Sequence, residues 1–141
     1  MGVNIPCEAL IHPAQDLSSY SFNWEEFSKN RVLLNSGKFG RKIYSIFSLK
    51  VPSNYTKSVV PWTEKKQAQL IREKERGLYT EIDIDSVKLI HLLPYSEYLK
   101  FYTNSVIYLD LYDVVACNTV VDCIATKCPI ILNRLPANEE Y

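Results

Sequence analysis

Apolar and polar positions repeat with two different periods along this chain, and the change of period marks its predicted elements. Short runs rich in Val, Leu and Ile predict strands at 31–37, 86–93, 105–113 and 129–135. Apolar residues at helical spacing predict helices at 38–49, 62–77, 95–104 and 115–127, with short helices at 23–30 and from 136 onward. The segment 51–61, which Pro52 and Pro61 bound, is predicted to be a loop.

From residue 31 onward strands and helices alternate with short connections. Such alternation is typical of an α/β fold with a parallel sheet and right-handed crossovers. We therefore expect a Rossmann-like domain over residues 31–141, preceded by an irregular lead-in over residues 1–30. Ligands of such sheets bind beyond the carboxyl ends of the strands, which here are predicted at 36–41, 92–94, 110–113 and 133–136.

Composition narrows the class of partner. The 141 residues suit one domain, and 16 basic residues balance 16 acidic ones. This balance argues against nucleic acid recognised through its phosphates. No window approaches the roughly 18 apolar residues of a membrane span, and no signal peptide is visible, so a cytoplasmic protein is expected. The four cysteines, Cys7, Cys117, Cys123 and Cys128, are expected to be free thiols, the last three of them buried.

The turn after the first strand, "SGKFGRK", combines glycines with positive charge. Gly37 and Gly40 allow a tight turn, and Lys38, Arg41 and Lys42 surround it with cations. Backbone N–H groups at the start of the following helix would suit a phosphate or diphosphate. The sequence matches no established phosphate-loop motif, so an ordinary turn with solvated basic residues is the competing interpretation.

Asp122 lies in a largely apolar helical stretch. On a helical wheel one face collects Cys117, Val120, Val121, Ile124 and Ala125, and the other collects Asn118, Thr119, Asp122 and Thr126. Asp122 is therefore either a solvated surface charge or an acceptor for the hydroxyl groups of a ligand. The acids just upstream, Asp110 and Asp113, are expected at a strand end, where Asp113 could instead cap the helix.

Two further expectations concern burial. His91 lies within an apolar strand and is expected to be a core histidine rather than a base. The charged helix at 62–77 is expected to lie on the surface with a narrow apolar stripe of Trp62, Ala68, Leu70 and Ile71.

The stretch "VIYLDLYDVVACNTVVDCIATKCPIILNRLPANEEY" resembles the C-terminal, donor-binding half of GT-B glycosyltransferases. It is most similar to a glycosyltransferase-like group found among large DNA viruses and some microbes. In that group a strand ending "LDLYD" leads into "A-N-N-x-V-x-E-C", a basic residue, "x-P-I-L-x-N-x-L-P-A" and "E-Y". The upstream "LLNSGKFGRKIYSIFSL" is similar to the group's first strand and phosphate-side turn, so the resemblance covers roughly residues 25–141.

The resemblance implies a site that holds a nucleotide sugar. Arg41, with Lys42 or Lys38, would face the donor diphosphate, and Asn118 and Thr119 would lie near the sugar or diphosphate. Asp122 would stand where these enzymes place the acid that binds the nucleotide ribose. No metal or other cofactor is implied, because the helix dipole and basic side chains neutralise the leaving diphosphate.

The chain also departs from the group. Asp122 stands where Glu is usual, and Asp113 lies nine residues upstream where a spacing of eight is common. Relatives are expected to continue beyond Tyr141, and the chain is expected to lack most of their N-terminal acceptor-binding domain. The leading hypothesis is a glycosyltransferase or its donor-binding fragment, not necessarily active alone, and the alternative is a non-catalytic binding or scaffold protein on the same fold. A response-regulator-like domain is a third hypothesis, against which the lack of paired acids after the first strand counts.

Overall fold

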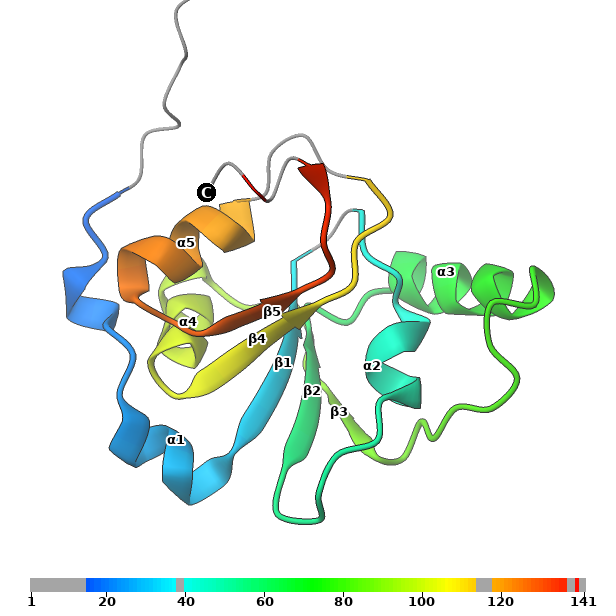
Figure 1. Ribbon diagram of the computed structural model, residues 1–141, viewed down its shortest axis with the longest axis horizontal. Coiled ribbons are helices and arrows are strands. Elements are labelled where there is room, and N and C mark those ends of the chain that lie inside the picture. The colour runs from blue at the N-terminus through cyan, green and yellow to red at the C-terminus, as the bar shows by residue number, and fades with distance from the viewer. Residues whose placement is uncertain (1–14, 38–39, 114–117, 137–138, 140–141) are drawn as a thin grey trace, which may run out of the picture.

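A five-stranded, fully parallel sheet forms the centre of the protein (Figure 1). The structure is a computed structural model that describes residues 15–37, 40–113, 118–136 and 139. The strands follow the order β3-β2-β1-β4-β5. They are β1 (Val32–Ser36), β2 (Thr56–Val60), β3 (Val87–Leu89), β4 (Ser105–Leu109) and β5 (Ile130–Leu132). This order confirms the expected α/β, Rossmann-like fold.

Helices cover both faces of the sheet. Helices α2 and α3 lie on one face and α4 and α5 on the other, while α1 precedes β1 (Figure 1). Their bounds are α1 (Trp24–Asn30), α2 (Tyr44–Ser48), α3 (Glu64–Glu75), α4 (Tyr95–Lys100) and α5 (Asn118–Thr126). Short 3-10 helices span Ser18–Tyr20 and Phe101–Thr103. Within the described part of the chain, no helix is both long enough and apolar enough to cross a membrane.

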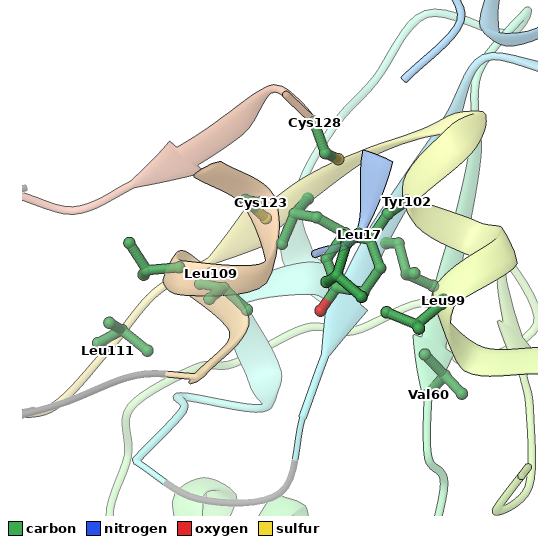
Figure 2. Packing of buried hydrophobic residues seen from close by; sticks show 11 residues of the cluster. Leu17, Val60, Leu99, Tyr102, Leu109, Leu111, Cys123 and Cys128 are labelled. Carbon is green, nitrogen blue, oxygen red and sulfur yellow. The ribbon is translucent and has the colours of Figure 1, made fainter. Parts of the chain in front are cut away.

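Neighbouring residues of the central strands point into two separate cores, as the pleat of a strand requires. Leu34 and Val60 belong to the core under α4 and α5, whereas Leu33 and Val59 belong to the core under α2 and α3. Figure 2 shows the first core, where fully buried Tyr102 lies among Leu17, Leu99 and the two thiols Cys123 and Cys128. Both thiols are buried and free, as expected, and the other two cysteines lie outside the described residues.

The predicted loop at 51–61 is wrong, because its second half is β2. This strand pairs with β1 on one side and β3 on the other, and is therefore central in the sheet. Its sequence, "TKSVV", hides the strand because Lys57 and Ser58 interrupt the apolar run. Both are nonetheless buried. Pro61 follows directly, so it ends the strand instead of marking a loop.

Other elements match the sequence more closely. Asn23 caps α1 as expected, since its side chain accepts hydrogen bonds from the N–H groups of Glu25 and Glu26. Strand β3 ends at Leu89, so His91 lies beyond it and is exposed; the prediction of a core histidine is wrong. Only Pro136 and Glu139 are described in the predicted final helix.

The order of the strands places a topological switch between β1 and β4. The chain proceeds from β1 to β2 and β3 in one direction, and from β4 to β5 in the other. The connections on either side of this point leave on opposite faces, and in open parallel sheets ligands usually bind beyond the carboxyl ends of the strands at such a point. Ser36 and Leu109 end these strands, and the segments that follow them supply the candidate site.

Candidate functional site at the carboxyl edge of the sheet

Arg41 lies buried at the switch point, with only 6% of its surface exposed. Its Nε donates a hydrogen bond to the Ser36 carbonyl at the end of β1, and a terminal nitrogen donates to Thr119 Oγ1 at 2.8 Å. Gly37 has a φ of 92°, and a Cβ there would collide with the guanidinium. The glycine therefore provides both the turn and the space for Arg41. Arg41 thus joins the end of β1 to the first turn of α5.

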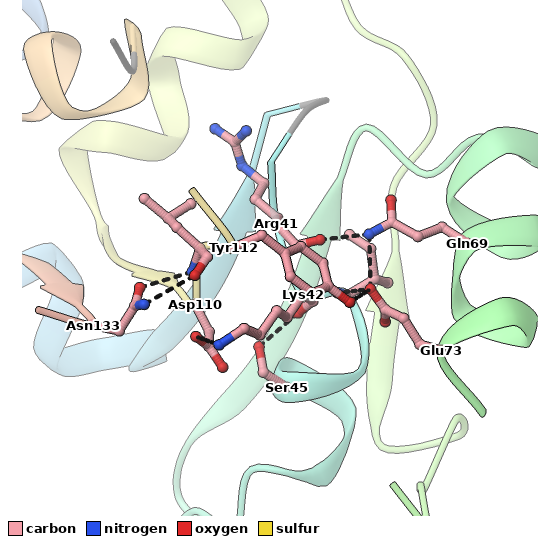
Figure 3. A network of polar contacts seen from close by, with 10 residues as sticks. Arg41, Lys42, Ser45, Gln69, Glu73, Asp110, Tyr112 and Asn133 are labelled. Atoms are coloured by element: carbon pink, nitrogen blue, oxygen red, sulfur yellow. Dashed lines mark hydrogen bonds and ion pairs between the residues drawn. The ribbon is translucent and has the colours of Figure 1, made fainter. Parts of the chain in front are cut away.

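Lys42 points to a different partner. Its ammonium pairs with the Asp110 carboxylate at 2.9 Å, which raises the pKa of Lys42, and it lies 5.7 Å from the centre of the Tyr112 ring. Figure 3 shows this pair together with the Arg41 side chain, which extends away from it. The adjacent residues Arg41 and Lys42 therefore have different partners, Thr119 and Asp110.

The amino end of α2, where an anion was expected, holds a carboxylate from the protein itself. Glu73 of α3 is 2% exposed and accepts hydrogen bonds from the N–H groups of Ile43, at 3.2 Å, and Tyr44, at 2.9 Å. It also accepts from Gln69 Nε2 at 2.8 Å and from the Tyr112 hydroxyl at 2.9 Å (Figure 3). A negative charge is favourable at this end of a helix. The backbone donors expected to bind a phosphate are therefore satisfied by Glu73.

The carboxyl end of α2 holds the opposite charge. The Lys57 ammonium, from β2, donates to the carbonyls of Phe47 at 3.2 Å and Leu49 at 3.0 Å. A cation is favourable where the last carbonyls of a helix lack backbone partners. Burial nevertheless lowers the pKa of Lys57. The five-residue helix α2 is thus held by a buried charge of the suitable sign at each end.

Lys66, in the first turn of α3, is buried without such partners. It is 2% exposed, and its Nζ has no hydrogen-bond partner in the described part of the protein. Burial, and secondarily the nearby positive charge of Arg41, lowers the pKa of Lys66 to about 7. Among the described residues, Asn35 Oδ1 is the other buried side-chain atom without a partner, and it belongs to the penultimate residue of β1.

Asp122 lies between α5 and α4 and is neither fully exposed nor fully buried. It accepts long hydrogen bonds from the hydroxyl groups of Tyr95, at 3.4 Å, and Tyr102, at 3.5 Å. The Tyr102 hydroxyl also lies 3.2 Å from the Tyr98 hydroxyl, which in turn contacts the Ser36 hydroxyl at the end of β1. Burial first, and the charge of Asp122 second, raises the pKa of Tyr95. A chain of hydroxyl groups therefore links Asp122 to the switch point.

The buried face of α5 differs from the wheel prediction. Thr119, Val120, Cys123 and Thr126 are buried, whereas Ile124 is 56% exposed. The two threonines can be buried because their hydroxyls are bonded, Thr119 to Arg41 and Thr126 to the Asp122 carbonyl at 2.7 Å.

The structure brings together only some of the residues predicted to form the site. Arg41 and Thr119 are in contact, Lys42 faces Asp110, Asp122 faces the tyrosines of α4, and Asn118 is exposed at the start of α5. Lys38 lies outside the described residues. Sequence reasoning missed Lys66, Gln69 and Glu73, which follow one another along α3 at spacings of three and four. This spacing places them on one helix face, but their charge indicated a solvated face.

The stripe predicted for α3 is half right, because Trp62, just before the helix, is half-buried and packs against Phe47. Leu70 is buried, but Ala68 and Ile71 are exposed, and Ile71 is 53% exposed. The helix instead turns Lys66 and Glu73 inward, where Glu73 meets the start of α2.

A separate groove of about 750 Å³ lies near the amino ends of β1, β2 and β4. Its rim carries charges of both signs, and two of them, Glu97 and Lys100, already pair at 2.7 Å. It therefore indicates no particular ligand charge, and the carboxyl edge has the more specific chemistry. No group of three or more metal-ligating side chains occurs among the residues that the structure describes.

Searches of family models, curated proteins and solved structures found no match to this chain. The resemblance noted in the sequence is thus supported at the level of the fold, a parallel five-stranded sheet of Rossmann-like order.

Proposed function

We propose that this chain binds the diphosphate of a nucleotide sugar at the carboxyl edge of the sheet, as the donor-binding half of a GT-B glycosyltransferase does. The observation that carries the proposal is the Arg41 guanidinium, buried at the switch point and bonded to Thr119 in the first turn of α5. Crevices at switch points are the usual ligand sites of open parallel sheets. A guanidinium there matches the geometry of phosphate oxygens.

The resemblance implies further site residues, and their positions in the fold limit the roles that each could have. Asn118 and Thr119 begin α5, where the helix dipole favours an anion. Asp122 would accept hydrogen bonds from the ribose hydroxyls, which would replace the long bond from the half-exposed Tyr95 hydroxyl. Lys42 would reach the diphosphate only by leaving Asp110, so we assign the larger electrostatic contribution to Arg41.

A non-catalytic scaffold is the second candidate function, and one observation favours it. Arg41, Lys42, Thr119 and Asp122 all have partners within the protein, and Glu73 occupies the amino end of α2. Such partners are what a purely structural network needs, because buried polar groups are costly when they are unpaired. The two candidates differ in whether a nucleotide sugar binds at all.

Amide NMR with UDP-glucose and GDP-mannose at about 1 mM, near the upper end of typical KM values, separates the two candidates. We expect shifts at Gly37, Gly40 and Arg41 and over 118–122, and we expect Arg41→Gln to abolish them. Arg76→Gln, at the exposed residue that follows α3, is the matched control. Thr119→Val is a milder variant, because it keeps the Arg41 charge and removes the hydroxyl that accepts a hydrogen bond from it. A wild-type spectrum that does not change with either compound would contradict the proposal and favour the scaffold.

A further inference from the structure

The position of Lys66 is unfavourable for a positive charge. Its Nζ is enclosed and has no hydrogen-bond partner in the described part of the chain. It is the third residue of α3, so it lies at the end of the helix where the dipole is positive. An unpaired ammonium in such surroundings is costly, because burial removes its water without replacing it.

The charged groups around Lys66 do not compensate for this cost. Arg41, from the turn after β1, is the charge that acts on it most, and it is of the same sign. On its own helix, Glu73 is engaged by the start of α2, while Glu64 and Lys65 are exposed. Two buried cations therefore share the carboxyl edge, and an anion is the charge that would stabilise both.

We infer that Lys66 couples ligand binding to a proton: a phosphate-bearing ligand held at Arg41 binds together with one proton that the Lys66 amine takes up from solvent. This inference rests on the proposed function. The free amine gains the proton and becomes an ammonium, the buffer acid in solution loses that proton, and no bond of the ligand forms or breaks. Lys66 is thus a positioning residue for the diphosphate, acting through charge.

The coupling does not need direct contact between Lys66 and the ligand. Arg41 already acts on Lys66 through space, so an anion seated on Arg41 acts over a similar distance with the opposite sign. The effect is large because the low dielectric of the interior screens it weakly. The low pKa of the free side chain, about 7, means that much of the amine is neutral before the ligand arrives.

Isothermal titration calorimetry of the full chain tests the coupling. UDP-glucose and GDP-mannose are suitable probes because the diphosphate diester of a nucleotide sugar does not titrate near neutral pH. Binding is measured at about pH 8 in Tris and in HEPES, whose ionisation enthalpies differ, so the difference in heat gives the protons exchanged. We expect uptake of about 0.9 proton in wild type and an affinity that falls by up to about fifty-fold between pH 7 and 9.

Matched variants locate the proton. Lys66→Met should abolish the uptake, and Lys65→Met, next to it on the exposed face of α3, should retain it. Lys66→Arg keeps a permanent charge and should bind without the pH dependence. Binding without proton uptake in wild type would overturn this inference and leave the proposed function intact. Absence of binding by both nucleotide sugars would instead contradict the proposed function.

A measurement without nucleotide tests the inference even if neither nucleotide sugar binds. The ¹³Cε signal of Lys66, assigned by its loss in Lys66→Met, should titrate near pH 7 in the free protein, and millimolar sulfate should move its midpoint upward. A midpoint near the ordinary value of 10.5 in the free protein would overturn the inference, as would a midpoint unaffected by the anion.

Discussion

Two lysines of the described residues are buried on the same side of the sheet, Lys57 of β2 and Lys66 of α3, and their electrostatic surroundings differ. Lys57 meets the carboxyl end of α2, where two carbonyls accept its hydrogen bonds. Lys66 belongs to the first turn of α3, near Arg41 and without a partner among the described residues. The same residue type is therefore a structural group at one site and a destabilised charge at the other. Burial lowers the pKa of both lysines, and the helix-end carbonyls that accept hydrogen bonds from Lys57 have no counterpart at Lys66 among the described residues.

The largest effect is expected at Glu73, whose negative charge holds the amino end of α2 as Lys57 holds the carboxyl end. Glu73→Ala should lower the free energy of unfolding by about 3–5 kcal/mol, because four donors lose their shared acceptor. Urea unfolding measures the change. Glu75→Ala, on the exposed face of the same helix, should stay within about 0.5 kcal/mol. Equal effects of the two variants would mean that α2 does not depend on the buried charge.

At Lys66 the comparison of the two lysines predicts that a substitution raises the free energy of unfolding, opposite to the effect at Glu73. Lys66→Met should stabilise the protein by about 2–4 kcal/mol near pH 6.5. The Met side chain is similar in length to Lys but carries no unpaired buried charge. The folded-state pKa of about 7 lies below the ordinary value of 10.5, so the unfolded chain binds more protons between these values. Wild-type stability should therefore rise as pH increases from about 7 to 10.5, and the advantage of Lys66→Met should shrink over that window.

Urea unfolding of wild type and Lys66→Met at several pH values measures this difference, with Lys65→Met as the control. A variant that is less stable than wild type at every pH would show that Lys66 has a favourable partner after all.

Lys57→Met should instead destabilise the protein, by about 1–3 kcal/mol, because two helix-end carbonyls lose their donor. Thermal unfolding near neutral pH measures the loss, and the exposed Lys88→Met on β3 serves as a control on a neighbouring strand. If Lys57→Met and Lys66→Met changed stability in the same direction, the contrast between the two lysines would be wrong.

The smallest effect is expected at Tyr112, which supplies one of the four hydrogen bonds to Glu73. Tyr112→Phe should cost about 0.5–1.5 kcal/mol at neutral pH. Burial, with the Glu73 hydrogen bond, raises the pKa of Tyr112 to about 12, so its contribution is complete below about pH 10 and is lost as pH rises through 12. A double-mutant cycle with Glu73→Gln should give a coupling energy above about 0.5 kcal/mol; additive changes would contradict the contact.

Much of the fold could be predicted from periodicity. Runs such as "VLL" in β1 and "VIYL" in β4 carry enough apolar side chains to indicate buried strands. The parallel arrangement followed from their alternation with helices. Strand β2 was missed because its buried Lys57 finds its acceptors on α2, and no pattern within the strand records them.

The candidate site was harder to predict for the same reason. Arg41 stood out because glycines and basic residues surround it, and the structure brings it into contact with Thr119. Lys66 and Glu73 did not stand out, because charged residues on a helix usually face water. Their burial depends on which groups α3 meets in the folded protein, namely the start of α2 and the region of Arg41.

The capping of α2 by Glu73 has a consequence for any free anion. A carboxylate that is tethered in position acts at a high effective concentration. A dissolved anion therefore displaces it only if the anion binds far more tightly. Glu73 also accepts hydrogen bonds from two backbone N–H groups and a tyrosine hydroxyl, and a phosphate would have to displace Glu73 from all three. Under the proposed function, Glu73 would therefore direct a phosphate group away from the start of α2 and toward Arg41, and the protein's own carboxylate would act as an internal competitor for the ligand.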